Sequence, residues 1–71
     1  MTVQTETKIM LTVEDANILQ VVQIGKLLNS LDCDFDFEQT SVDVDGFHLY
    51  TITADVTGKS ARVYKAIDLL S

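Results

Sequence analysis

This 71-residue chain has one histidine, His48, and one cysteine, Cys33. A histidine can act as a general acid or base, and a cysteine can act as a nucleophile. Strand alternation places His48 opposite Asp43 across a predicted hairpin, where a carboxylate would orient the imidazole. No nucleophile stands in a recognisable context beside it, so a surface cross-strand pair explains this contact better. Cys33 lies among acidic neighbours, a setting that does not activate a thiol. We therefore expect Cys33 to be a core cysteine.

The segment Thr57-Gly58-Lys59-Ser60 resembles the end of a phosphate-binding loop. The first glycine of that motif would fall at Thr53, so we interpret the segment as a strand-to-helix turn with Ser60 as the cap. The chain also shows no paired acid and base, no cluster with metal-ligand spacing and no dinucleotide fingerprint. The sequence therefore predicts a protein that is not an enzyme and that uses no cofactor and no metal.

A row of acidic side chains alternates with other residues in the middle of the chain. Carboxylates two positions apart on a strand lie about 6.6 Å from each other, too far to share one ion as a calcium loop does. Three functions fit the row: it keeps a sheet edge from pairing with other chains, it attracts a basic partner, or it imitates a phosphate backbone. With one carboxylate of the following strand, this predicted acidic face consists of Asp32, Asp34, Asp36, Glu38 and Asp55.

The elements that position these residues begin with a strand and a helix. Period-two alternation over residues 3–13 predicts a strand with one buried face. Its inward residues are Val3, Ile9, Leu11 and Val13. Glu14 and Asp15 open a helix for which Thr12 is the N-cap, and this helix ends near Leu31.

A hairpin and a second helix follow. Asp45-Gly46 predicts a two-residue hairpin loop, since both of its residues would take a positive φ. This loop pairs Val44 with Phe47, Val42 with Leu49, Phe37 with Ala54 and Phe35 with Val56. The hairpin face that packs on the helices carries Cys33, Phe35, Phe37, Tyr50, Ile52, Ala54 and Val56. The inward residues of the last helix are Ala61, Tyr64, Ile67 and Leu70, with Val63 and Ala66 on the flanks of this stripe.

The other face of the hairpin changes from acidic to apolar towards the turn. The residues of this apolar tip are Val42, Val44, Phe47 and Leu49. Because the change falls at paired positions near Thr40 and Thr51, a bulge in one strand does not account for it. Two interpretations remain open: the tip projects beyond the helices as an interface, or local twist returns it to the core.

The element order β-α-β-β-α predicts one α+β domain over residues 1–71. A crossover through the first helix and then a hairpin give a three-stranded sheet in the order 1-3-2 with both helices on one face, a truncated ferredoxin-like arrangement. The first strand is then a long edge with few charges. We expect two copies to pair through this strand or through the apolar tip, because so small a domain gains stability from a partner.

The amino-acid composition limits the classes of partner that this chain can bind. Eleven Asp and Glu against five Lys and Arg give a net charge of −6, which argues against binding nucleic acid through its phosphates and against docking on an anionic membrane. One cysteine allows no internal disulfide and favours a reducing, cytoplasmic setting. We also expect no secretory leader and no membrane span, because the chain shows neither apolar pattern.

Residues 13–70 resemble the ACT-domain family of small regulatory modules. The resemblance lies in Asp15-Ala16-Asn17-Ile18-Leu19, in the acid-flanked strand with its Asp-Gly hairpin, and in Lys65-Ala66-Ile67-Asp68-Leu69-Leu70. It implies a ferredoxin-like βαββαβ fold, side-by-side pairing, and amino-acid binding where the first strand meets the first helix, with Asp15 and Asn17 as ligand contacts. This chain lacks the family's glycine after the strand-one turn and has no counterpart of the fourth strand.

These observations lead to three functional hypotheses. The first is a small acidic, non-enzymatic interaction module, a homodimer that binds and modulates a protein partner. In it the apolar tip supplies the anchors, and Asp34, Asp36, Glu38 and Asp55 supply charge complementarity to a basic partner. The second is an ACT-like domain that senses an amino acid. The third is an acidic inhibitor that mimics nucleic acid, whose binding would weaken steeply with salt.

Overall fold

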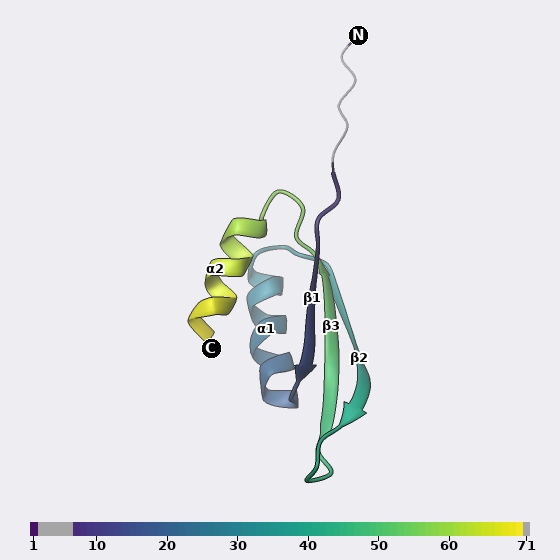
Figure 1. Cartoon of the computed structure of the whole chain (residues 1–71). Helices are drawn as coiled ribbons and strands as arrows, with labels where there is room; N and C mark the ends of the chain where they lie inside the picture. The colour runs from purple at the N-terminus through teal and green to yellow at the C-terminus, as the bar shows by residue number, and fades with distance from the viewer. Residues whose placement is uncertain (2–6, 71) are drawn as a thin grey trace.

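The computed structural model describes residues 1 and 7–70 and forms an α+β sandwich of two layers. The elements are β1 (Met10–Ala16), α1 (Ile18–Ser30), β2 (Phe35–Val42), β3 (His48–Asp55) and α2 (Ser60–Leu70). The strands form one antiparallel sheet in the order β1-β3-β2, and both helices lie on the same face of it (Figure 1). The predicted class, element order and strand order are therefore confirmed, and the arrangement is of the ferredoxin-like kind.

The core lies between the helices and the middle strand. Val56 and Val63 are fully buried and Ile52 is nearly so. The other buried side chains are Ala16, Val21, Ile24, Leu28, Cys33 and Ala54. Cys33 is thus the core cysteine that its sequence context predicts. Burying these apolar side chains is the main force that holds the helix layer on the sheet.

The predicted parity of the first strand is correct, but its end is not. Ile9, Leu11 and Val13 pack against the core, whereas Val3 lies outside the described residues. A bulge follows, because Val13 pairs with Ile52 and Ala16 with Tyr50. β1 therefore continues through positions that were expected to begin the helix.

The start of α1 corrects the predicted cap. Asp15 takes a positive φ of 56° in the bulge, so it cannot belong to a helical turn. Asn17 is the N-cap instead: its Oδ1 accepts from the Gln20 backbone N–H at 2.8 Å, and the Gln20 side chain accepts from the Asn17 N–H at 2.9 Å. This reciprocal pair satisfies two backbone donors at the helix start. The other end agrees with the prediction, since Leu31 is the C-cap.

The hairpin loop is wider than predicted. Its residues 44–46 lie between Asp43 and Phe47, whose backbones are joined by a 2.9 Å hydrogen bond. The Asp43 carboxylate accepts from the backbone N–H groups of Asp45 and Phe47, both at 2.9 Å, and Gly46 takes a φ of 86°. An aspartate that bonds backbone groups further along the chain stabilises a three-residue turn of this kind.

The wider loop shifts the strand register. Phe35 pairs with Ala54 and Phe37 with Ile52, so the predicted pairs are wrong by two residues while the faces are unchanged. A bulge between Gln39 and Ser41 shifts the register again towards the turn. Consequently His48 pairs with Val42 and not with Asp43.

α2 is rotated relative to the prediction. Val63 is buried and Ile67 packs against the core, whereas Ala61 and Tyr64 are exposed.

Among the described residues, neither helix has the length and apolar character needed to cross a membrane.

Candidate functional site

One face of the sheet is not covered by helices, and the predicted acidic face lies on it. Asp36 pairs with Thr53, Glu38 with Thr51, and Met10 with Asp55, so these side chains share that face. An open cleft of about 520 Å³ lies along it, lined by Lys8, Met10, Asp34, Phe35, Asp36, Phe37, Glu38, Thr51, Thr53 and Asp55. Four carboxylates and one ammonium group therefore line this cleft, which makes it suited to a cationic surface.

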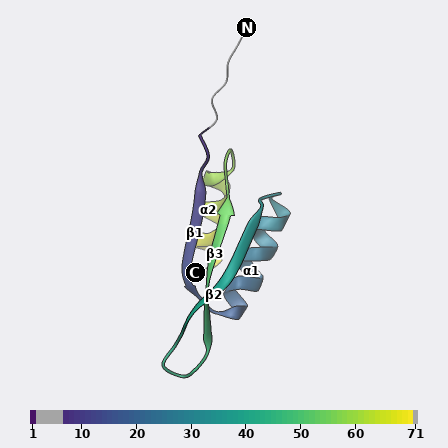
Figure 2. The ribbon, with the colours of Figure 1, turned by 90° about the vertical axis from the view of Figure 1, so that its right-hand side faces the viewer.

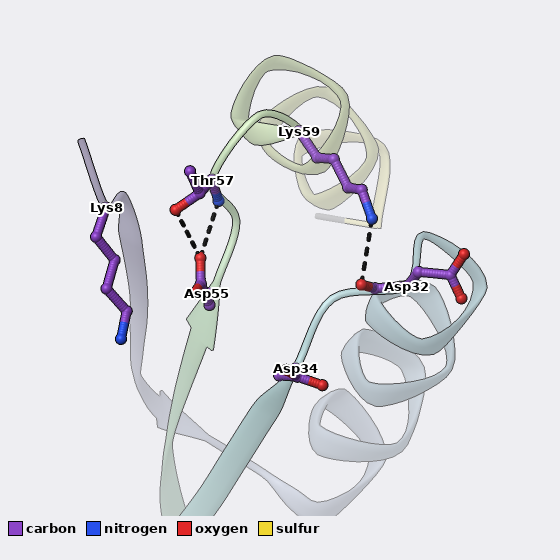
Figure 3. A pocket seen from close by; sticks show the side chains of 6 residues that line it. All are labelled: Lys8, Asp32, Asp34, Asp55, Thr57 and Lys59. Carbon is purple, nitrogen blue, oxygen red and sulfur yellow. Dashed lines mark hydrogen bonds between the residues drawn. The ribbon is translucent and has the colours of Figure 1, made fainter. Parts of the chain in front are cut away.

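A second cleft of about 420 Å³ lies at the end of this face and is lined by Lys8, Asp32, Asp34, Asp55, Thr57 and Lys59. The Asp32 carboxylate points away from Asp34 and Asp55 (Figure 3). Lys59 closes one side of the cleft. Its Nζ donates to the carbonyl oxygens of Leu31 at 2.7 Å and of Asp32 at 3.2 Å. This ammonium group therefore binds the C-terminal end of α1, where the helix dipole favours a cation. The turn that resembled a phosphate-binding loop uses its lysine to hold the fold together.

Two hydrogen bonds from Thr57 lower the pKa of Asp55. Its carboxylate accepts from the Thr57 hydroxyl at 2.7 Å and from the Thr57 backbone N–H at 3.0 Å. These two bonds, the hydroxyl bond first, lower the pKa of Asp55 below its ordinary value of 3.8, and the charge of Lys8 adds a smaller effect. Both bonds favour the charged form, so Asp55 stays anionic on this face in mild acid.

Acidification is expected to test this assignment. Because the pKa of Asp55 is lower in the folded chain, its contribution to stability is present above 3.8 and is lost as pH falls through the lower folded value. Asp55→Asn should therefore lower the urea midpoint at neutral pH and flatten its decline in acid. Asp68→Asn, at an exposed position of α2, serves as the control. Parallel acid profiles of the wild type and Asp55→Asn would contradict the assignment.

The loop that joins β2 to β3, at the end of the hairpin that carries the apolar tip, lies beyond the lower end of α1 (Figure 1). Val44 is 101% exposed, Phe47 67% and Val42 53%, and Leu49 is half-buried. Val42, Val44 and Phe47 are therefore not packed into the core. The bulge does place Val42 and Leu49 on opposite faces, since Val42 pairs with His48 and Leu49 with Ser41. The tip is thus an exposed apolar end of the hairpin and not a patch on one face.

Both outer strands leave an edge free within the part of the chain that the structure describes. In β1 the Ile9 carbonyl accepts from the Val56 N–H at 2.9 Å, so the backbone groups of Met10 and Thr12 point away from β3. In β2 the Asp34 carbonyl accepts from the Asp55 N–H at 2.9 Å. By the same alternation, the backbone groups of Phe35, Phe37 and Gln39 point outward.

The residues that the ACT resemblance implies as ligand contacts are not joined in one site. Asn17 is engaged in the α1 cap, and Asp15 lies in the bulge. Asp15 lines a small cavity of about 190 Å³ together with Val13, Glu14, Ala16, Gln20, Gln23, Ile24, Ile67 and Leu70. Over residues 1 and 7–70, no three His, Cys, Asp or Glu side chains are placed to hold a metal ion.

Two features of this surface were not foreseen from the sequence. One is the Lys59 contact with α1, whose partners are separated from it by 27 and 28 positions. The other is at the β2 edge, where the Asp36 carboxylate accepts from the Phe37 N–H at 2.8 Å. A signal for the second existed in the alternation of Phe and acidic residues along a strand expected at the edge.

Comparisons with protein-family models, curated proteins and solved structures found no match for this chain.

Proposed function

We propose that this protein is a non-enzymatic interaction module that binds a basic protein partner through its acidic face and apolar tip. The observation that carries the proposal is the exposure of Val44 and Phe47 at the end of the hairpin, next to a sheet face lined by four carboxylates. Exposed apolar groups beside a charged surface are typical of interfaces, in which the apolar anchors supply affinity and the charges supply rate and specificity.

The charge contribution is tested by neutralising the acidic strand. The variant Asp34→Asn, Asp36→Asn, Glu38→Gln should reduce affinity capture of partner proteins from a lysate several-fold at low salt. The loss should shrink at high salt, where charges are screened. A matched control variant neutralises three acidic residues outside this face. Asp43 is left unchanged in the control because its carboxylate stabilises the turn. That control carries Glu14→Gln, Asp15→Asn and Asp68→Asn, since asparagine also tolerates the left-handed conformation of residue 15. Equal loss with both variants would show that net charge and not this face is recognised.

A protein that mimics nucleic acid would also bind a basic partner through its acidic face. The contribution of the apolar tip to binding distinguishes that hypothesis from our proposal. A mimic relies on charge, so its capture would fall steeply with salt and would not depend on Phe47. We expect dependence on both, because the exposed apolar groups stand beside the charges.

We further propose that two copies pair through β1. The free backbone groups of Met10 and Thr12 offer an edge that a second β1 can extend in the antiparallel sense, which gives a two-fold dimer. Light scattering should report a dimer at high micromolar concentration for the wild type. Thr12→Pro removes only an outward N–H and should give a monomer that still folds. A monomeric wild type would refute this pairing.

The amino-acid sensor stays a second candidate because of the cavity beside Asp15. Thermal unfolding across the free amino acids separates it from the first proposal. A saturable rise in Tm with one amino acid, lost in Asp15→Asn, would favour the sensor, whereas the interaction module predicts no rise.

A further inference from the structure

The free edge of β2 has two chemically different sides. On the uncovered face it carries Asp34, Asp36 and Glu38, and on the helix face it carries Phe35 and Phe37. Phe35 is 37% exposed and Phe37 48%. Between these two rows lie the outward backbone groups of Phe35, Phe37 and Gln39. The pairing with β3 is regular from Phe35 to Gln39 and then interrupted by the bulge, so five consecutive residues present a straight edge.

α1 extends sideways past this edge. Figure 2 views the uncovered face, and there β2 is the outer strand while α1 is drawn beyond it. A Cβ atom built on Gly25 would lie 3.2 Å from the Phe35 ring, so this side of α1 faces β2. Val22 and Ile18 lie one and two turns before Gly25 on the same stripe, and they are 46% and 57% exposed. The helix therefore leaves an apolar stripe over the space next to β2.

We propose that this edge binds an extended segment of the basic partner, in which apolar and basic residues alternate, as an additional strand. The segment's apolar side chains pack on Phe35, Phe37 and the α1 stripe, and its Lys or Arg side chains meet Asp34, Asp36 and Glu38. Backbone hydrogen bonds join the two strands, as in other cases of strand addition. This proposal rests on the proposed function and specifies that the partner binds as an extended strand.

The charges decide which occupant fits. A second copy of β2 would place carboxylate rows side by side, and like charges on neighbouring strands destabilise a pair. A basic strand reverses the sign of that interaction. Asp36 adds selectivity, since its carboxylate occupies the outward N–H of Phe37. A basic side chain competes for that carboxylate and frees the N–H for the incoming strand, whereas a neutral strand leaves it covered.

A synthetic peptide of alternating Lys and Val tests the proposal with the full-length protein. We expect saturable binding by fluorescence anisotropy, with NMR shifts at the Phe35 and Gln39 amides. Two control peptides keep the composition: one groups Lys and Val in blocks, and one carries N-methyl groups on the backbone positions that face β2. Each should bind at least about tenfold more weakly than the alternating peptide. The N-methylated peptide loses several backbone hydrogen bonds, and the block peptide cannot place Val on one side of the edge and Lys on the other.

A proline at each edge supplies the protein controls. Gln39→Pro removes an outward N–H of β2 and should weaken the alternating peptide, whereas Thr12→Pro on the β1 edge should not. Absence of peptide binding, or equal binding of the N-methylated or block peptide, would overturn strand addition. Tip-dependent capture of a partner that persists in that case would leave the proposed function intact, so the two failures are distinguishable.

Discussion

Replacing Val44 and Phe47 with serine is expected to lower capture of the protein partner at least about tenfold, while the unfolding midpoint stays close to that of the wild type. Both side chains lie in or beside the hairpin loop, and they are 101% and 67% exposed, so their removal takes nothing from the core. Apolar anchors at the centre of an interface carry much of its affinity, and truncation of one commonly costs about 2 kcal/mol or more. Capture from a lysate, quantified by mass spectrometry at low and high salt, measures the loss.

The control is an equally apolar side chain at another exposed position. Leu69 in α2 is 80% exposed, so Leu69→Ser removes a comparable surface group far from the hairpin loop. Capture by Leu69→Ser should match the wild type. If the tip variant keeps its partners, or if it unfolds, the tip is not an anchor of the kind proposed.

Leu28→Ala is expected to produce the largest loss of stability. Leu28 is fully buried and lies in the middle of the core, and a buried Leu→Ala change costs about 2–5 kcal/mol. A domain of 71 residues has a free energy of unfolding of about 4–10 kcal/mol, so the variant should be largely or partly unfolded at 37 °C. Urea denaturation followed by circular dichroism measures the difference.

Leu69→Ala serves as the matched variant, because the same truncation at an exposed position changes the free energy of unfolding by no more than about 0.5 kcal/mol. Similar midpoints for Leu28→Ala and Leu69→Ala would mean that α1 does not pack on the sheet as described.

The sequence predicted the architecture because local periodicity carries it. Alternation identified Ile9, Leu11 and Val13 as one face of β1. The strand order followed from connection rules, which hold for almost any sequence with these five elements. A register error of two residues leaves Asp36 and Glu38 on the sheet face that the alternation assigned to them.

Register, bulges and caps were not predictable in the same way, because each depends on one side-chain contact with the backbone. The Asp43 carboxylate selects a three-residue loop over the two-residue loop that Asp45-Gly46 favours. Asp15 takes a left-handed conformation that β1 and α1 together require, although aspartate has only a modest preference for it. The rotation of α2 has a related cause: burial of Val63 outweighed that of Tyr64, whose hydroxyl favours a position near water.

The free edge of β2 was interpreted from the sequence as protected by its charges, and the structure adds its second side. Carboxylates on one face disfavour pairing with a second copy, because like charges would lie side by side. The exposed Phe37 and the exposed apolar stripe of α1 add an apolar side to this edge, and they support our proposal that an oppositely charged strand binds there. Periodicity could not reveal this, because the lateral position of a helix over a sheet is set by packing contacts such as that of Gly25 with Phe35.

Site-specific photo-crosslinking tests the central claim most directly. A photoreactive amino acid replaces Val44 at the tip, or Leu69 in α2 as the reference position, in the otherwise intact protein. The account predicts that position 44 crosslinks to a basic protein with high yield and that position 69 does not, with the yield from position 44 reduced by neutralising Asp34, Asp36 and Glu38. Equal yields from the two positions, or crosslinks from position 44 that are insensitive to these three carboxylates, would contradict it.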